Sequence, residues 1–175
     1  TPLTRLKLQL ALLKQKDVSE KMSRDIDDME KMLNDYLQYA KTQSQEETEE
    51  INLKDFFLNI KKKINNDKII IKNPENQIYL KCRQTALERS FNNIIQNGLT
   101  YGEKIYISFT KTKAGAILMF EDDGPGVPED QYRNIFKPFF RIDKSRSLNT
   151  SGVGLGLAIT EDIINSHGGN INLSK

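Results

Sequence analysis

Glu121-Asp122-Asp123-Gly124-Pro125-Gly126-Val127 is the segment around which the rest of the chain is best interpreted, because a carboxylate and two glycines follow directly on an apolar run. Residues 115–120 are apolar and partly β-branched or aromatic, which predicts a buried strand that ends beside Asp122. An aspartate at that point can accept a hydrogen bond from an exocyclic amine, and Gly124 and Gly126 allow a ligand to approach the main chain. The same residues also suit an ordinary surface turn, so other motifs must decide between a ligand site and a turn.

The composition indicates a globular chain whose partners must be inferred from local sites. Its 175 residues, 37% of them hydrophobic, suffice for one core plus an extra element or for two small domains. The net charge of +2 comes from 26 basic and 24 acidic residues, so the overall charge does not favour nucleic acid or a membrane surface. The single cysteine, Cys82, excludes an intrachain disulfide and is best interpreted as a small packed side chain in a reducing compartment. The sequence has no apolar run of membrane-spanning length and no signal-peptide pattern, so we expect a cytoplasmic fragment, cut from a longer protein.

Two amphipathic patterns predict an N-terminal pair of helices, followed by a linker. The first apolar stripe consists of Leu3, Leu6, Leu10 and Leu13, and the second of Met22, Ile26, Met29, Leu33, Tyr36 and Ala40. Their short connection predicts an antiparallel hairpin over residues 1–43 that forms a homodimer as a four-helix bundle. Residues 44–50 are acidic and lack apolar anchors, which predicts a solvated linker.

The rest of the chain, residues 51–175, predicts an α+β domain. Strands are expected at 51–53, 69–71, 78–80, 104–113, 115–120 and 171–173, with the strands at 69–71 and 78–80 flanking a turn at 73–76. Helices are expected at about 53–64 and 84–99, in a short piece that ends at 136, and after Gly156. Residues 142–150 are polar and aperiodic, which predicts a mobile lid held by aromatic residues at one end.

A glycine cluster before the last helix is a candidate anion site. Gly152, Gly154 and Gly156 alternate with Val153, Leu155 and Leu157, and main-chain amides at a helix start can bind a phosphate. The spacing fits neither a Rossmann loop nor a Walker loop, because no strand leads into it and no Gly-Lys-Ser/Thr follows. The alternative to a phosphate site is a flexible hinge.

Two asparagines on the helix expected at 84–99 are a candidate metal site. Asn93 and Asn97 are one turn apart and therefore share a face. Their amide oxygens suit Mg²⁺, which needs few protein ligands when phosphates supply the rest, although both residues could also be simple caps. Tyr101, just beyond, offers a ring against which adenine can lie. The only histidine, His167, stands before Gly168-Gly169, where we expect it to cap helix carbonyls rather than to act chemically.

Taken together, these motifs resemble those of sensor histidine kinases, especially the osmosensor type. The resemblance rests on four motifs in that family's order: Asn93-x-x-x-Asn97 in its helix, Asp122-Asp-Gly-Pro-Gly126, Phe136-Lys-Pro-Phe139 and Gly152-Val-Gly-Leu-Gly156-Leu. In addition, Thr1-Pro2-Leu3-Thr4-Arg5-Leu6 is similar to the end of that family's phosphoacceptor box. The resemblance spans nearly the whole chain and implies an α/β sandwich ATP-binding domain of the Bergerat type after the helical hairpin.

The resemblance also implies a role for each motif residue. Asn97 would hold Mg²⁺, Asn93 would act on the phosphate side of the catalytic site, and Asp122 would bind the adenine amine. The remaining ATP contacts would come from Tyr101, Gly124, Gly126, Phe136, Phe139, Arg141, Gly152, Gly154, Leu155, Gly156 and Leu157. The family's modified histidine and its acidic neighbour would precede Thr1 and are absent, while the position of Thr1 is associated with dephosphorylation of the response regulator.

The family context implies that the full-length protein is anchored in the bacterial inner membrane and passes phosphate to a response-regulator receiver domain. Two positions depart from many relatives: Gly98 replaces alanine, and Thr100 replaces a basic residue that would neutralise phosphate. Lys137, Arg141, Lys144 and Arg146 are candidates to supply the missing charge. Two alternatives remain: a gyrase- or chaperone-type ATPase, which would need a glutamate at Asn93, and a nucleotide-sensing module without kinase activity.

Overall fold

The computed structural model describes residues 46–72, 77–113, 115–142 and 154–174, together with isolated residues between 19 and 33. The chain divides into two units, Thr1–Gln45 and Glu46–Lys175. The described residues of the first unit are helical, with Ile26 buried and three apolar side chains exposed: Met22, Met29 and Leu33. This agrees with a helix at that place, but the predicted hairpin is not confirmed, because Thr1 and most of its helical residues lie outside the described ones.

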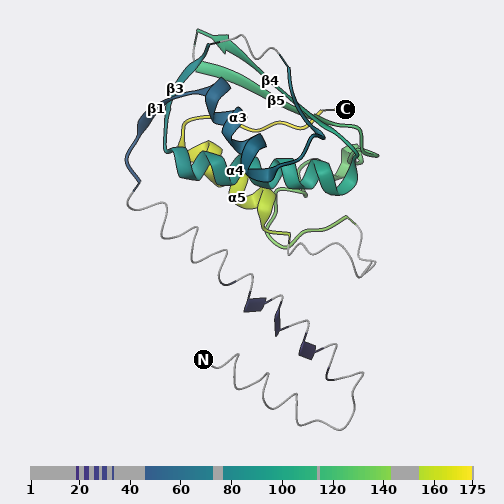
Figure 1. Ribbon diagram of the computed structural model, residues 1–175. Helices are drawn as coiled ribbons and strands as arrows, with labels where there is room; N and C mark the ends of the chain where they lie inside the picture. The colour runs from purple at the N-terminus through teal and green to yellow at the C-terminus, as the bar shows by residue number, and fades with distance from the viewer. Residues whose placement is uncertain are drawn as a thin grey trace. The chain divides into compact units, whose positions relative to one another are not determined.

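The second unit is an α+β domain, as predicted. Its elements are β1 (Glu49–Asn52), α3 (Leu53–Ile64), β2 (Ile69–Ile71), β3 (Tyr79–Cys82), α4 (Gln84–Tyr101), β4 (Ile105–Thr112), β5 (Gly115–Asp122), the 3-10 helix η1 (Glu129–Gln131) and α5 (Gly156–Ser166). β1 pairs with β3 in an antiparallel ribbon, while β4 lies between parallel β2 and antiparallel β5. The helices lie together below the long β4–β5 hairpin in Figure 1, with α5 next to α4.

The core lies between the strands and helices α3 and α4. Ile105, Ile107 and Phe109 alternate along β4 with more exposed residues, so one face of the strand is buried. Five phenylalanines from α3, α4, β4 and β5 form one cluster of rings, with neighbouring ring centroids 5.3–6.0 Å apart: Phe56, Phe57, Phe91, Phe109 and Phe120. Full burial of such a side chain stabilises the fold by about 2–3 kcal/mol.

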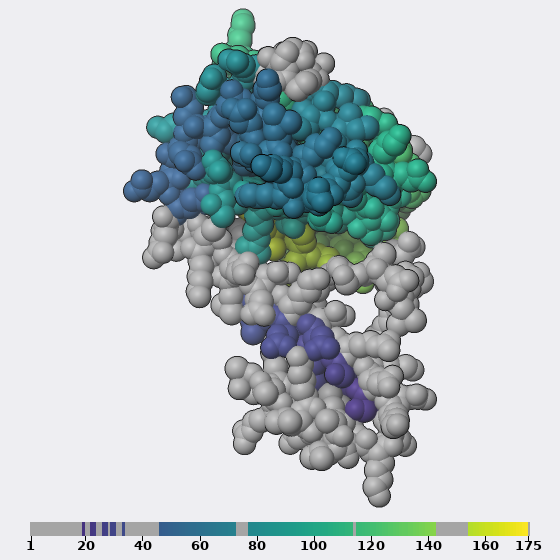
Figure 2. Space-filling model, viewed as in Figure 1, coloured from purple at the N-terminus to yellow at the C-terminus, as the bar shows by residue number. Residues whose placement is uncertain are grey.

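The outer side of the β4–β5 hairpin is exposed to solvent. Ile117 and Met119 on β5 are 58% and 51% exposed, so the sheet has one buried and one solvent-facing side. In the space-filling view, the face turned to the reader is formed mainly by the blue and teal residues of the β1–α4 part of the chain (Figure 2).

Local side chains define where α3 begins and ends. The Asn52 Oδ1 accepts a hydrogen bond from the Lys54 amide at 2.9 Å, which is the usual N-cap contact. Asn65 ends the helix with a left-handed φ of 51°, a conformation that asparagine tolerates. Lys61, Lys62 and Lys63 form the last turn, where positive charge complements the helix dipole. Lys63 also forms a 2.6 Å ion pair with Glu88 of α4.

Helix α4 begins in a different way, and it changes the interpretation of residues 44–50. Its N-cap residue, Arg83, makes no side-chain cap. Instead the Glu46 carboxylate accepts hydrogen bonds from the amides of Thr85 and Ala86, the latter at 3.0 Å. Glu49 and Glu50 belong to β1. The acidic stretch predicted as a solvated linker therefore supplies a helix cap and the start of a strand.

One predicted strand is absent from the structure, and two others are present with separate partners. Residues 171–173 have an alternating apolar pattern but are irregular rather than a strand. The strands on either side of residues 73–76 do not pair with each other, since β2 pairs with β4 and β3 with β1. Within the described part of the chain, no helix is both long enough and apolar enough to cross a membrane.

Cys82 is a packed core side chain, as predicted. It is buried opposite Glu49 in the β1–β3 ribbon. Burial raises the pKa of its thiol to about 11, and the nearby carboxylates of Glu49 and Glu46 act in the same direction. The thiol is therefore neutral at physiological pH, which makes it a weak nucleophile.

Candidate nucleotide-binding site

Helix α4 carries the asparagine motif. Asn93, Asn97 and Tyr101 follow at four-residue steps and so lie along one face. Both asparagines are partly buried, whereas Tyr101, the last residue of the helix, is 58% exposed. The Asn97 amide forms no hydrogen bond with any residue that the structure describes. It is thus a neutral oxygen donor available to a ligand.

Asp122 reaches this helix from the end of β5. A Cβ added at Gly98 would lie 3.4 Å from the Asp122 Cβ, so the aspartate stands beside the turn of α4 that carries Asn97. The Asp122 Oδ1 accepts a hydrogen bond from the Gly124 amide at 3.0 Å. A Cβ at Gly124 would come within 2.7 Å of that oxygen and 2.9 Å of the Tyr101 carbonyl oxygen. Only glycine fits at position 124, which leaves bare main chain next to the carboxylate.

The glycine cluster approaches the same helix one turn earlier, at Asn93. The Asn93 Nδ2 donates a hydrogen bond to the Gly156 carbonyl at 3.1 Å. Gly154 has a φ of +78°, and its carbonyl accepts a hydrogen bond from the Phe139 amide at 2.9 Å. A Cβ at Gly154 would lie 2.8 Å from the Phe140 carbonyl oxygen, so glycine is required there for both conformation and space. Gly152 lies outside the described residues.

The first turn of α5 offers free amides. The helix begins at Gly156, and its N-cap residue, Leu155, makes no side-chain hydrogen bond to it. Leu155 and Leu157 are partly buried and anchor the turn. Unpaired amides at the positive end of a helix dipole suit an anion such as a phosphate group. The geometry therefore fits the predicted phosphate side of the site.

Polar contacts that the sequence did not indicate hold α5 to α4. The buried Thr160 hydroxyl lies 2.9 Å from the Gly156 carbonyl oxygen and 3.2 Å from that of Ser90. At the far end, His167 Nδ1 lies 2.7 Å from the Ile163 carbonyl oxygen, while its Nε2 lies 3.1 Å from the Arg83 amide nitrogen, which donates to it. The predicted capping role of His167 is confirmed, and the ring also joins the two helices.

The segment expected to seat the lid is described only in part. Phe136 is partly buried, while Phe139 is 60% exposed with a left-handed φ of 65°. Arg141 is exposed, and Lys144 and Arg146 lie outside the described residues. The Lys137 Nζ donates to the Asn134 Oδ1 at 2.7 Å. Gly126 has a φ of +75°, a conformation that suits glycine in the loop after Asp122.

Thr100 does not replace the missing basic residue. Its exposed hydroxyl donates to the Gln96 carbonyl at 2.6 Å, within the same helix.

The described residues include no group of three or more histidine, cysteine, aspartate or glutamate side chains arranged to hold a metal ion. Mg²⁺ at this site would therefore rest on the Asn97 amide oxygen and on oxygens of the nucleotide, as its preference for hard oxygen ligands allows.

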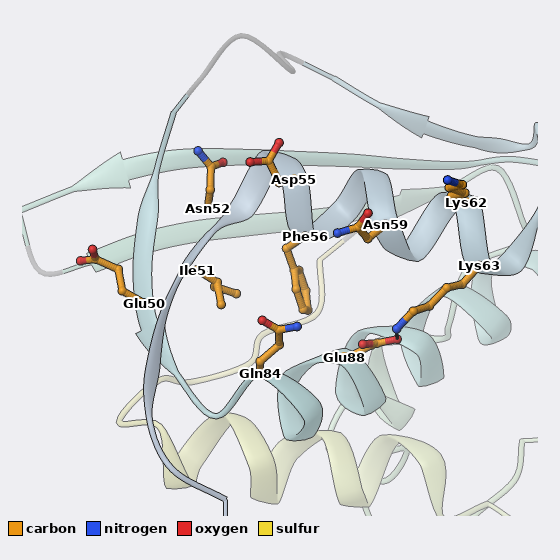
Figure 3. A pocket seen from close by; sticks show the side chains of 10 residues that line it. All are labelled: Glu50, Ile51, Asn52, Asp55, Phe56, Asn59, Lys62, Lys63, Gln84 and Glu88. Atoms are coloured by element: carbon orange, nitrogen blue, oxygen red, sulfur yellow. Dashed lines mark hydrogen bonds and ion pairs between the residues drawn. The ribbon is translucent and has the colours of Figure 1, made fainter.

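A separate cavity of about 400 Å³ lies near the start of α4. Figure 3 shows its side chains, which come from β1, α3 and the first turns of α4 and carry charges of both signs. None of the predicted nucleotide residues lines it. The candidate site is instead at the C-terminal half of α4, where Asn93, Asn97, Asp122, Gly124, Gly154 and Gly156 come together.

Comparison with known proteins agrees with this arrangement. Residues 82–175 match the family model described as "Histidine kinase-, DNA gyrase B-, and HSP90-like ATPase". The matched range covers more than half of the chain and contains α4, β5 and α5. The chain therefore belongs to this family of ATPases.

Within the family, the similar proteins are sensor histidine kinases, which confirms the predicted resemblance. The chain is 34% identical to the sensor histidine kinase GtrS of Pseudomonas aeruginosa over 177 residues, covering 100% of this chain and 36% of GtrS. The histidine kinase domain of the E. coli osmosensor EnvZ is 27% identical, with a TM-score of 0.54 over 75% of this chain and 83% of that one. Full-length ShkA in complex with AMPPNP has the same fold at 20% identity, with a TM-score of 0.67 over 93% of this chain and 36% of ShkA.

These matches define what the domain is. It is the ATP-binding domain of the sensor histidine kinase type, and ATP is the nucleotide that domains of this kind bind. The chain spans about a third of the length of GtrS, 36%, so the activity of the whole protein belongs to the proposal that follows.

Proposed function

We propose that this chain is the catalytic part of a sensor histidine kinase, which transfers the γ-phosphoryl group of Mg-ATP to a histidine and then to an aspartate of a response regulator. One observation carries the proposal. Asn97, Asp122 and the glycine turn at 154–156 are far apart in sequence but meet around the C-terminal half of α4. Each offers the group that one part of Mg-ATP requires: an amide oxygen, a carboxylate and free amides.

The roles follow from this chemistry. Asp122 accepts a hydrogen bond from the adenine amine, and the exposed ring of Tyr101 lies beside the base. The amides at the start of α5 bind phosphate oxygens, and Asn93 fixes that turn through its bond to Gly156. Mg²⁺, when held by Asn97, neutralises phosphate charge. The reaction breaks the bond between the γ-phosphorus and the bridging oxygen, forms a phosphorus–nitrogen bond to the acceptor imidazole, and releases ADP and the proton that the imidazole loses. Catalysis of this kind depends mainly on positioning and charge.

The acceptor is not His167. This residue is the only histidine of the 175, and both of its ring nitrogens lie within hydrogen-bonding distance of main-chain groups. We propose that the acceptor histidine belongs to the helical part of the full protein, outside these residues, and that Thr1 takes part in dephosphorylation of the regulator. The exposed Met22, Met29 and Leu33 support dimerisation through the helical hairpin predicted at residues 1–43. Anchoring of the full protein in the bacterial inner membrane is part of the same proposal.

Two other functions have less support from the residues of this site. An ATPase of the gyrase or chaperone type would need a carboxylate at position 93 to activate water, and Asn93 instead donates its amide to Gly156. A nucleotide-sensing module without kinase activity is favoured by Thr100, whose hydroxyl is bonded to a helix carbonyl and supplies no positive charge. Binding and phosphoryl transfer must therefore be measured separately.

Calorimetry with ATP tests the binding site. We expect wild type to bind ATP, and Asp122→Ala to weaken binding by about tenfold or more, since a hydrogen bond to a charged group contributes about 1.5–3 kcal/mol. Asp55→Ala is the control, because Asp55 is an exposed carboxylate at the cavity of Figure 3. Equal affinities for the Asp122 and Asp55 variants would contradict the assignment.

Phosphoryl transfer is tested by adding, as a separate protein, the helical domain of a sensor kinase that contains its acceptor histidine. Incubation with terminally labelled ATP should label that domain with acid-labile phosphohistidine and leave this chain unlabelled. Label retained on this chain would contradict the assignment of the acceptor. ATP binding without any label on the added domain would favour the nucleotide-sensing module.

A further inference from the structure

Asp123 stands next to the proposed adenine-binding carboxylate and binds the turn that follows α4. Its Oδ1 accepts hydrogen bonds from the amides of Glu103 at 2.6 Å and Lys104 at 2.9 Å. These bonds, with that from Lys104 as the largest cause, hold the pKa of the Asp123 carboxyl below its ordinary value. The Asp123 side chain is exposed, so these hydrogen bonds are not needed to satisfy a buried carboxylate. Their structural effect is to hold the turn at residues 103–104.

The segments that Asp123 joins are packed without spare room. A Cβ added at Gly102 would lie 2.7 Å from the Asp123 Oδ1 and 3.0 Å from the Gly124 nitrogen. The Gly102 amide in turn donates to the Gly98 carbonyl at 2.7 Å, which ends α4. Gly124 approaches the Tyr101 carbonyl so closely that a side chain would not fit. The end of α4 and the loop after β5 are therefore fixed against each other, and Asp123 supplies the hydrogen bonds between them.

We propose that Asp123 is a positioning residue that fixes Asp122 and the main chain of Gly124 relative to the α4 face bearing Asn97 and Tyr101, and so determines the preference for adenine. Asp123 touches neither base nor phosphate and acts only through the turn at 102–104. This inference rests on the proposed role of Asp122 in binding the base. Hydrogen bonds weaken steeply with misalignment, so a shift of the loop reduces the contact to the adenine amine. The phosphate contacts at α5 belong to another segment and are unaffected.

The test compares ATP and GTP affinities in three variants at position 123. Asp123→Ala removes the acceptor, Asp123→Asn keeps a neutral acceptor, and Asp123→Glu keeps the charge but moves it outward. We expect Asp123→Ala to weaken ATP binding by about tenfold and GTP binding very little, so the affinity ratio falls. Asp123→Glu should lower the ratio also, whereas Asp123→Asn should keep most of it. Asp55→Ala should match wild type in both affinities.

The outcomes separate a positioning role from a structural one. A general loss of stability would lower both affinities together and leave the ATP-to-GTP ratio unchanged, which would overturn the inference. A thermal melt of each variant identifies any that does not fold. If Asp123→Ala does not fold, the ATP-to-GTP affinity ratios of Asp123→Asn and Asp123→Glu test the inference in its place. Wild type that binds ATP and GTP equally would contradict the proposed role of Asp122 itself, whereas a wild-type preference kept in Asp123→Ala would overturn only the role of Asp123.

Discussion

Asn97 is the residue on which the proposed metal site depends. Its amide is partly buried on α4 and forms no hydrogen bond with any described residue, while Asn93, one turn earlier, is already bonded to Gly156. The two asparagines therefore differ in function although they belong to one motif. Asn93 joins two helices, and Asn97 is the candidate ligand of Mg²⁺ in the proposed site.

We predict that Asn97→Ala removes the magnesium-dependent part of ATP affinity. Alanine leaves no oxygen donor, so the gain in affinity on adding Mg²⁺, measured by calorimetry with and without a chelator, should fall by about tenfold. Gln96→Ala is the control, because Gln96 is the exposed neighbour on the same helix. If the variant responds to Mg²⁺ as wild type does, Asn97 does not hold the ion.

At the residue scale, the sequence indicates groups that bind ligands better than groups that hold the fold around them. Asn93, Asn97, Asp122 and Gly156 could be proposed as site residues from the sequence because each belongs to a short motif with fixed spacing. The bond from Thr160 to Ser90 and that from Arg83 to His167 join residues 70 and 84 positions apart. No local pattern marks such partners, because they are set by how α4 and α5 pack.

Among the secondary-structure elements, α4 is unusual in that its start is capped from a distant segment. Glu46 lies just before β1 and its carboxylate accepts hydrogen bonds from Thr85 and Ala86. The residue directly before the helix, Arg83, supplies no such bond. The helix that bears Asn93 and Asn97 is thus bonded at its other end to the segment that follows the first unit.

We predict that Glu46→Ala lowers the free energy of unfolding by about 1 kcal/mol, the usual cost of losing an N-cap. The measurement is urea denaturation followed by circular dichroism. Glu47→Ala is the matched control, since Glu47 is an exposed neighbour with the same charge and no hydrogen bond or ion pair to a described residue. Hydrogen exchange should also speed up in the first turn of α4 in Glu46→Ala alone. Equal stability of the two variants would show that the cap contributes nothing.

Residues 44–50 and 171–173 show where prediction from the sequence fails. Residues 44–50 were predicted to be a solvated linker, and residues 47–50 are exposed, but the acidic composition did not indicate that Glu46 caps a helix or that Glu49 pairs with Cys82. The alternating pattern at 171–173 predicted a strand that the structure does not contain. Helices α3, α4 and α5 were predicted well because each has a strong apolar periodicity of its own. Strand pairing and capping depend on partners far along the chain, so composition indicates them poorly.

At the scale of the whole second unit, the aromatic core and the nucleotide site are parts of one arrangement. Phe91 stands two residues before Asn93, and Phe120 two residues before Asp122. Their ring centroids are 5.3 Å apart, so the core holds together the helix and the strand that carry the site. Phe57 of α3 contacts both rings, with centroids at 5.4 and 5.9 Å, and also stacks on Phe109 at 5.8 Å.

We predict that Phe57→Ala destabilises this unit by about 3–5 kcal/mol, the usual cost of truncating a buried phenylalanine. Phe57 is 0% exposed and contacts rings of α4, β4 and β5, so the change leaves a cavity between α3, α4 and the β4–β5 hairpin. Phe57→Leu fills part of that space and should cost less. Leu58→Ala is the control, because Leu58 is the next residue of α3 but is 43% exposed. The measurement is the urea midpoint at constant m-value.

Saturating ATP should restore part of the stability lost in Phe57→Leu, because ATP that binds only the folded state stabilises that state. A Phe57→Ala midpoint equal to that of Leu58→Ala would mean that the rings do not hold α4 and β5 together, and the site would need another source of rigidity.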